Sequence, residues 1–211
     1  MEKKISLFVL GDFYPGKSIC DRLNNYDILD RSNKWLSNYT INSDLCLVNL
    51  ESPITKHNKI ISKTGPALRG EICGLEFLKK IGCNLVTTAN NHIMDYGKQG
   101  LEDTMNSLKE HEIDLIGSGL NKSDSKEIKY VSFNGIIIAI LNFAENEWST
   151  SINDDDPGAS SLNEISNFYD IQEAKTNADK IIVITHGGNE MYNLPSPRLK
   201  ELLRFFIDAG A

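Results

Sequence analysis

Four short apolar segments of this sequence end in polar residues that could bind a metal ion. These residues are Asp12, Glu51, the pair Asn91-His92, and His186. Two carboxylates, one amide and two imidazoles form a ligand set for a divalent cation, and the mixture of oxygen and nitrogen donors suits Mn, Fe or Zn better than Ca. Each residue alone is weak evidence, because an aspartate after a strand is often a turn residue and a lone histidine is often structural. Their spacing is too wide for a local metal-binding loop, so the prediction depends on a fold that brings them together.

The elements that would position these residues form an α/β pattern. The apolar segments are short, rich in Ile, Val and Leu, and alternate with amphipathic stretches. We predict strands at 5–10, 45–50, 85–88, 113–116, 128–133, 136–141 and 181–185, and helices at 33–39, 71–81, 99–111, 164–178 and 196–209. In open α/β sheets ligands bind beyond the carboxyl ends of the strands, which is where the candidate ligands lie.

Local signals refine this pattern at three places. Asn134-Gly135 supplies the positive φ angles of a two-residue hairpin turn, so the sheet should be mixed rather than purely parallel. The last helix has Ser196 as its expected N-cap, Pro197 at its first position and Gly210 after its end. The stretch from 142 to 163 is long and irregular, and loops of this length are usually functional or mobile. Its acidic triplet at 154–156 could ligate a cation, but a solvated turn is the simpler interpretation.

Composition excludes several classes of protein. The chain has 211 residues, which suits a single domain spanning 1–211 with a sizeable core. Its formal net charge is −7 and it has no cluster of Lys and Arg, so we expect no nucleic-acid partner. The longest apolar run, 136–141, is far shorter than the roughly 20 residues of a membrane-spanning helix. The N-terminus has no signal-peptide pattern. We therefore predict no transmembrane segment and a cytoplasmic location.

The four cysteines, Cys20, Cys46, Cys73 and Cys83, form no C-x-x-C motif and lie within or beside apolar segments. We expect them to be buried, reduced thiols.

At its polar motifs the sequence resembles a known family. The motifs are Gly11-Asp12, Asn49-Leu50-Glu51-Ser52-Pro53-Ile54-Thr55, Asn90-Asn91-His92-Ile93-Met94-Asp95-Tyr96-Gly97, Gly117-Ser118-Gly119, His186-Gly187-Gly188-Asn189-Glu190, and the segment from Pro195 to Ala211. In this order, over nearly the whole chain, they resemble capsule-biosynthesis and poly-γ-glutamate synthesis proteins of the CapA type, in the calcineurin-like metallophosphoesterase superfamily. The Asn-Asn-His-x-x-Asp-x-Gly motif is the most specific of them.

The resemblance implies a four-layer α/β/β/α sandwich of mostly parallel, mixed sheets. It implies metal ligation by Asp12, Glu51, Asn91 and His186, with Glu51 in the bridging position. His92 would be the acid that protonates a leaving oxygen, and Asp95 would orient its ring.

The sequence departs from the superfamily pattern in two places. The first superfamily motif is Asp-x-His, whereas Asp12 is followed by Phe13 and Tyr14. The usual histidine ligand of this motif is therefore missing, and the resemblance implies a site for one or two divalent ions of Mn, Fe or Zn. Family members also continue after the Asp208–Ala211 segment into a strand and a Gly-His-x-x-His motif, so we expect the C-terminal part of the domain to be missing from this chain.

The leading hypothesis is metal-dependent hydrolysis at a phosphoester or related anionic group, in capsule or poly-γ-glutamate biosynthesis. The substrate would be an anionic small molecule or polymer, and other polymer-synthesis proteins are candidate partners. The alternative is a non-catalytic accessory or binding protein of a polymer-synthesis complex that uses the same pocket. A nucleotide-binding α/β protein is a weak third hypothesis, because Gly117-Ser118-Gly119 lacks the third glycine of the dinucleotide motif and no Walker lysine motif is present.

Overall fold

The computed structural model describes residues 4–25, 36 and 38–211. Its strands are β1 (Leu7–Phe13), β2 (Leu45–Leu50), β3 (Leu85–Thr87), β4 (Asp114–Ile116), β5 (Ser118–Gly119), β6 (Lys129–Phe133), β7 (Ile136–Ala144), β8 (Gly158–Ala159) and β9 (Lys180–His186). Its helices are α1 (Lys17–Asn25), α3 (Cys73–Lys80), α4 (Gly97–Glu110), α5 (Lys122–Ser125), α6 (Glu164–Asn177) and α7 (Pro197–Ala209). All seven predicted strands are confirmed within a few residues. The predicted helix at 33–39 lies mostly outside the described residues, and α1, α5, β5 and β8 were not predicted.

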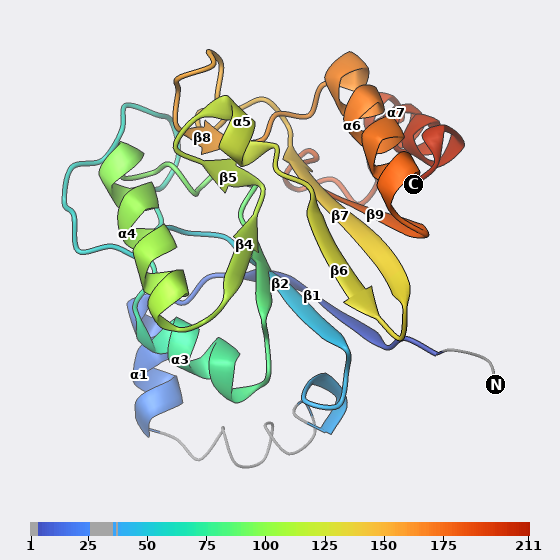
Figure 1. The fold of residues 1–211 in the computed structure, drawn as a ribbon. Helices are drawn as coiled ribbons and strands as arrows, with labels where there is room; N and C mark the ends of the chain where they lie inside the picture. The colour runs from blue at the N-terminus through green and yellow to red at the C-terminus, as the bar shows by residue number, and fades with distance from the viewer. Residues whose placement is uncertain (1–3, 26–35, 37) are drawn as a thin grey trace.

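The elements form four layers (Figure 1). The first sheet has the order β1-β2-β3-β4 and is entirely parallel. The second has the order β6-β7-β9, with β6 antiparallel and β9 parallel to β7. Strands β5 and β8 form a separate, two-stranded antiparallel sheet. Helices α1, α3 and α4 cover the outer face of the first sheet, and α6 and α7 cover the outer face of the second. The mixed α/β/β/α sandwich implied by the family resemblance is therefore confirmed.

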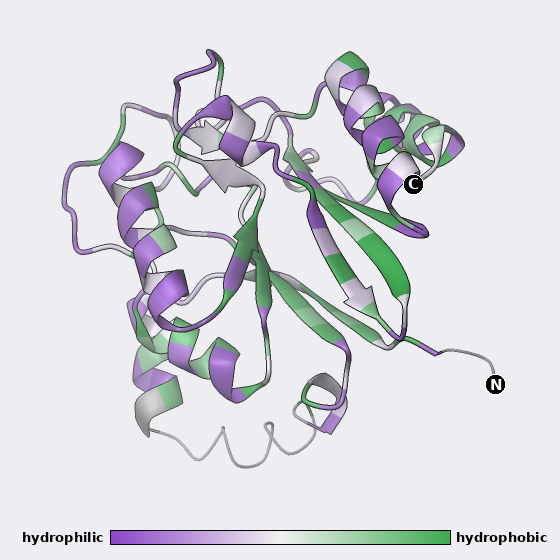
Figure 2. Cartoon of the chain, in the orientation of Figure 1, coloured by the Kyte–Doolittle hydropathy of each residue, from purple (hydrophilic) through white to green (hydrophobic). Residues whose placement is uncertain are grey.

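Three layers of apolar side chains hold the sandwich together. The central layer lies between the sheets and includes Leu47, Leu85 and Ile140, each 1% exposed or less. The outer layers join each sheet to its helices, through Leu75 and Leu78 on one side and Phe143 and Phe206 on the other. Strand β2 is buried along its whole length, which explains its continuous apolar sequence. Figure 2 shows the same distribution, with hydrophobic strands inside and hydrophilic helix faces outside.

The predicted turn and cap residues adopt the expected geometry. Asn134 and Gly135 have φ angles of 54° and 75°, so the β6–β7 hairpin closes through a turn with two positive φ angles. The Ser196 side chain accepts a hydrogen bond from Leu199 N at the start of α7. Gly210 ends that helix with a φ of 130°, a conformation that favours glycine.

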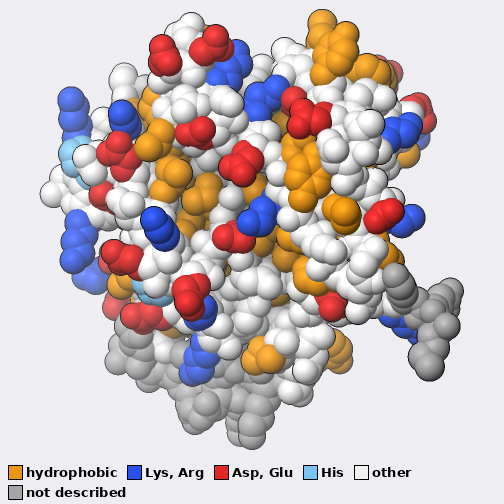
Figure 3. Space-filling view, in the orientation of Figure 1, with side chains coloured by type: hydrophobic (Ala, Val, Ile, Leu, Met, Phe, Trp, Pro, Cys, Tyr) orange, Lys and Arg blue, Asp and Glu red, His pale blue; other side chains and the backbone are white. Residues whose placement is uncertain are grey.

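The surface carries charges of both signs. On the face shown in Figure 3, acidic and basic side chains are interspersed rather than gathered in one patch. No helix in the described part of the chain is both long and apolar enough to cross a bilayer.

The prediction of reduced thiols is wrong for two of the four cysteines. Cys20 of α1 and Cys73 of α3 form a disulfide bond. Cys46 and Cys83 are free and buried, as predicted. The error arose because Cys20 and Cys73 are separated by 53 residues, and only the packing of α1 against α3 brings them together.

Replacing Cys20 and Cys73 with serine should lower the free energy of unfolding by about 2–4 kcal/mol, because the bond restricts a long loop in the unfolded chain. For a protein of this size that corresponds to a fall in melting temperature of about 4–16 °C. Calorimetry with and without reductant measures it. Reductant should lower the melting temperature of the natural protein and leave that of the double variant unchanged. An equal effect on both proteins would show that this disulfide does not stabilise the fold.

Candidate metal centre

Asp12 is placed by an irregularity in strand β1. The register of β1 against β2 runs evenly from Leu7 to Val9 and then shifts, so that Asp12 lies opposite Asn49. Such irregularities often re-aim a side chain near a functional site. Asn49 Nδ2 donates a hydrogen bond of 2.7 Å to Asp12 Oδ1. The carboxylate is thereby held at the carboxyl end of the first sheet while 56% of its side chain stays exposed.

The other candidate ligands come from neighbouring strand ends. Glu51 directly follows β2, and its backbone N–H donates to Phe13 O over 3.0 Å. Asn91 lies in the turn after β3, where Asn90 fixes the backbone through hydrogen bonds from its Nδ2 to Asn49 Oδ1 and Leu50 O. His186 is the last residue of β9 and reaches the site from the second sheet.

These four side chains converge on one point. His186 Nδ1 lies 3.6 Å from Asp12 Oδ1, and His186 Nε2 lies 3.5 Å from Glu51 Oε1. His186 Nε2 is also 3.2 Å from Asn91 Oδ1. One ligand atom from each of Asp12, Glu51 and His186 lies within 4.8 Å of the other two. The residues line an open cavity of about 630 Å³.

The electrostatics of the cluster suit a cation. Burial raises the pKa of Glu51 above its ordinary value, and the neighbouring Asp12 carboxylate raises it further, while His186 and His92 partly offset the shift. A bound divalent cation would offset the free-energy cost of keeping Glu51 charged beside Asp12, because it favours the charged form of both carboxylates. The donor set of carboxylate, amide and imidazole groups therefore fits a transition-metal ion.

His92 and Asp95 form a second, buried group beside these ligands. His92 Nδ1 lies 2.7 Å from Asp95 Oδ2, which also accepts a hydrogen bond of 2.6 Å from Leu68 N. Lys63 Nζ donates to Asp95 Oδ1 and lies 3.3 Å from His92 Nδ1. The side chains of Asp95 and Lys63 are only 0% and 4% exposed, so this is a buried ion pair.

The pKa of Asp95 reflects these contacts. Burial by itself would raise it, but the hydrogen bonds from His92, Lys63 and Leu68 N outweigh burial and hold it below its ordinary value. Asp95 is therefore a carboxylate acceptor that orients the imidazole ring of His92 through its Nδ1–H.

Three contributors were not predicted as site residues. Lys63 gave no sequence signal, because it lies in a polar loop far from any predicted strand end. Asn49 belongs to a quoted motif, and its position at the end of β2 could have identified its role as the residue that holds Asp12. Glu145 accepts hydrogen bonds from Gly188 N at 2.7 Å and from Arg198 at 2.5 Å. It thereby orders the loop that follows His186.

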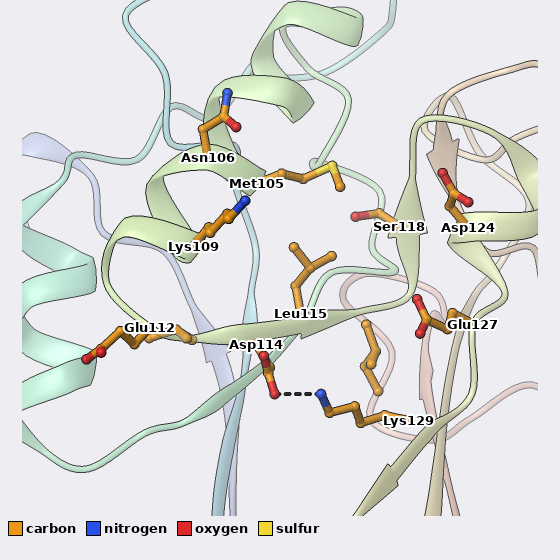
Figure 4. Close-up of a pocket in the computed structure, with 12 residues that line it drawn as sticks. Met105, Asn106, Lys109, Glu112, Asp114, Leu115, Ser118, Asp124, Glu127 and Lys129 are labelled. Carbon is orange, nitrogen blue, oxygen red and sulfur yellow. Dashed lines mark hydrogen bonds and ion pairs between the residues drawn. The ribbon is translucent and has the colours of Figure 1, made fainter.

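A separate cavity of about 580 Å³ lies between α4, β4 and the start of β6 (Figure 4). It contains none of the candidate ligands. Its charged residues include Lys129, which is paired with Asp114 over 2.6 Å, and Lys109, whose side chain points into the cavity.

Comparisons with known proteins agree with the fold and with the family resemblance. A family model described as "Bacterial capsule synthesis protein PGA_cap" matches residues 6–211. The "Capsule biosynthesis protein CapA" of Bacillus anthracis is 33% identical over 217 residues, which cover 99% of this chain and 53% of that protein. The "PGA biosynthesis protein CapA" of Bacillus subtilis (strain 168) is 34% identical over 173 residues, which cover 80% of this chain and 45% of that protein. The chain thus spans about half the length of the curated relatives it matches.

Solved structures share the fold. A phosphatase from Mycoplasma pneumoniae superposes with a TM-score of 0.56 at 24% identity, covering 99% of this chain and 61% of that one. A putative 5′-nucleotidase from Staphylococcus aureus superposes with a TM-score of 0.59 at 18% identity, covering 97% and 43%. At these identities the likeness concerns the fold alone. The family model, by contrast, covers nearly the whole chain, including every candidate ligand, and on that basis the chain belongs to the bacterial capsule synthesis protein family PGA_cap.

Proposed function

We propose that this chain forms a metal-dependent hydrolytic centre of the metallophosphoesterase type, acting on a phosphoester or related anionic group in capsule or poly-γ-glutamate synthesis. The convergence of Asp12, Glu51 and His186 within 4.8 Å carries the proposal. We also propose that residues 1–211 form a single domain, because one apolar layer joins the two sheets.

Asp12, Glu51, Asn91 and His186 would hold one or two ions of Mn, Fe or Zn. When bound, such an ion supplies Lewis-acid chemistry and activates water near neutral pH. Glu51 would be the bridging ligand, and its carboxylate is near both Asp12 and His186. Asn49 keeps Asp12 in position by donating to its carboxylate.

His92 would donate a proton to the leaving oxygen. Asp95 accepts the Nδ1–H of the ring, which fixes the tautomer so that Nε2 handles the transferred proton. Lys63 holds the far oxygen of Asp95. Asp95 and Lys63 thus position the acid without contacting the substrate.

The substrate would be an anionic small molecule or polymer, and other polymer-synthesis proteins are the expected partners. The cytoplasmic location stays a prediction. The Cys20–Cys73 disulfide weighs against it, because disulfides persist mainly in oxidising compartments.

Metal binding is the first test of this proposal. At a free concentration of about 100 Kd, Mn²⁺ or Zn²⁺ should stabilise the protein by about 2.7 kcal/mol, which raises its melting temperature by about 5–11 °C. Glu51→Gln should abolish most of this shift, because it removes a ligand charge. Asp155→Asn is the matched control, since Asp155 is an exposed carboxylate in the acidic triplet and should not alter the shift. The melting curve of each variant is recorded with and without metal.

Hydrolysis of bis(p-nitrophenyl) phosphate tests the chemistry. We expect turnover that depends on added metal, is lost in EDTA and is lost in Glu51→Gln. A protein that takes up metal but never turns over this ester or a phosphomonoester would favour the non-catalytic accessory role. A protein that takes up no metal would contradict the hydrolytic centre.

A further inference from the structure

The residue that follows strand β7 lies directly beside the candidate ligand His186. Strand β7 ends at Ala144, which pairs with His186 at the end of β9. Glu145 continues this pairing, because its backbone N–H donates to His186 O over 2.9 Å. The backbone of Glu145 therefore holds the end of β9 in place.

The side chain of Glu145 holds the next two residues of the same loop. Glu145 Oε2 accepts a hydrogen bond of 2.7 Å from Gly188 N. The carboxylate packs over Gly187, since a Cβ atom at position 187 would lie 2.5 Å from Glu145 Cγ and 2.7 Å from Glu145 Oε2. Gly188 has a φ of 127°, a conformation that favours glycine. The close approach of Glu145 and the backbone turn after His186 thus explain the two glycines of this motif.

Arg198 fixes the other oxygen of the same carboxylate. Its Nη2 donates to Glu145 Oε1 over 2.5 Å, and its Nη1 donates to Glu164 Oε1 over 3.4 Å. Arg198 is the second residue of α7, and the first turn of that helix contains no acidic residue. Because the helix dipole disfavours a positive charge at a helix N-terminus, helix stability does not explain this arginine. Its contact with Glu145 does.

One carboxylate therefore holds both ends of the segment 188–198, through Gly188 N at one end and Arg198 at the other. This segment forms a wall of the metal-centre cavity, which it lines with Asn189, Glu190, Tyr192, Asn193, Leu194 and Pro195.

The ring of His186 makes its contacts across the cavity, with residues of the first sheet and its loops. Nδ1 lies 3.2 Å from Asn49 Nδ2, and Nε2 lies 3.2 Å from Asn91 Oδ1. On the side of the second sheet, the position of His186 depends on its backbone, and Glu145 is bonded to that backbone and to Gly188 N.

We propose that Glu145 is a positioning residue of the metal centre and that Arg198 keeps its carboxylate in place. This role rests on the proposed function, in which His186 binds the ion. Glu145 does not line the metal-centre cavity, so it acts through the backbone on both sides of Gly187. It orients the His186 ring and the cavity wall before the ion binds, and a ligand that is already fixed loses less conformational entropy on binding.

Isothermal titration of the EDTA-treated and dialysed protein tests this role, with Mn²⁺ or Zn²⁺ as the probe, whichever binds the natural protein more tightly. Glu145→Ala should weaken binding by about 10–100-fold, the usual effect of removing a group that orients a metal ligand. Glu145→Gln keeps an oxygen acceptor for Gly188 N, so it should lose less than Glu145→Ala. Glu164→Ala is the matched control, because it removes the other carboxylate that Arg198 contacts and leaves the bond to Gly188 N intact. It should bind the ion as the natural protein does.

Gly187→Ala reaches the same contact from the other side. The added methyl group would displace the Glu145 carboxylate, so this variant should also weaken ion binding. In the Glu145→Ala background the same substitution should have little further effect, because the contact that it disturbs is already absent. Such non-additivity is expected of residues that act on each other.

Hydrogen exchange in EDTA supplies a measurement that needs no metal. The amides of residues 187–195 should exchange faster in Glu145→Ala than in the natural protein and at an unchanged rate in Glu164→Ala. The amides of β7 should exchange equally in all three proteins, which shows that the variants share one fold.

Ion affinity unchanged in Glu145→Ala, an equal loss in Glu164→Ala, or equal effects of Gly187→Ala in the two backgrounds would overturn the positioning role. The titrations involve no turnover, so their outcome is independent of the hydrolysis assay. A natural protein that binds the ion without any dependence on Glu145 would refute this role alone. Glu145-dependent ion binding in a protein without hydrolytic activity would refute the hydrolase alone. A natural protein that binds neither ion would contradict the metal centre and the positioning role together.

Discussion

Replacing His92 with alanine should lower kcat/KM by about 10²–10⁴-fold for an ester with a poor leaving group, the usual contribution of a general acid. The geometry supports this role, because Asp95 fixes one ring nitrogen of a buried imidazole beside the proposed ligands. The loss should depend on the substrate. A p-nitrophenyl leaving group departs without a proton, so its ester should lose far less than a methyl or other alkyl ester. Steady-state kinetics with the two esters measures both losses.

His57→Ala is the control for this experiment, because His57 lies in a different loop, where its backbone N–H donates to Thr55 Oγ1, and it contacts neither Asp95 nor a candidate ligand among the described residues. It should leave both rates unchanged. Equal losses for the two esters in His92→Ala would contradict the acid role and indicate that His92 only supports the site. Metal-induced stabilisation, measured in parallel, shows whether the variant still binds its ion.

Replacing Lys63 with methionine should lower the free energy of unfolding by about 3–5 kcal/mol, the usual cost of removing one partner from a buried ion pair. The methionine fills similar space but leaves the fully buried Asp95 carboxylate with His92 and Leu68 N as its remaining partners. Urea denaturation measures the change. Lys79→Met is the control, since the Lys79–Glu112 pair is largely exposed and its loss should not shift the unfolding midpoint.

The difference in unfolding free energy between the natural protein and Lys63→Met should also depend on pH. Because the pKa of Asp95 is held below its ordinary value, its contribution to stability is present above the unfolded-state pKa of about 3.9 and is lost as pH falls through the lower folded-state value. The difference between the natural protein and Lys63→Met should be full at pH 7 and shrink as the buffer is taken below about pH 4. A difference that stays constant across this range would show that Lys63 contributes by packing rather than by charge.

The sequence predicted the strands and helices well, because their signals are local. The helix at 197–209 begins at Ser196 and ends before Gly210, and the hairpin turns at Asn134-Gly135. Each of these boundaries depends on the backbone preferences of one or two residues. By contrast, α1 was missed because the residue before it is Gly16, which has no side chain that could cap the helix.

The identity of the candidate ligands also followed from the sequence. Asp12, Glu51, Asn91 and His186 each follow an apolar segment, and parallel strands carry their carboxyl ends to one edge of a sheet. The pattern of apolar segments gave no information about how closely the two sheets pack against each other. His186 belongs to the second sheet, and only the packing of β9 against the first sheet places its ring within 3.6 Å of Asp12.

The sequence by itself therefore determined the main elements, the candidate ligands and the family, since these depend on residue preferences and local motifs. Tertiary structure alone decided the Cys20–Cys73 bond, the buried Lys63–Asp95 pair and the convergence of the candidate ligands from two sheets. Each of these joins residues from separate loops, helices or strands. Their contacts arise from the packing of whole layers, and no local preference of the chain encodes that packing.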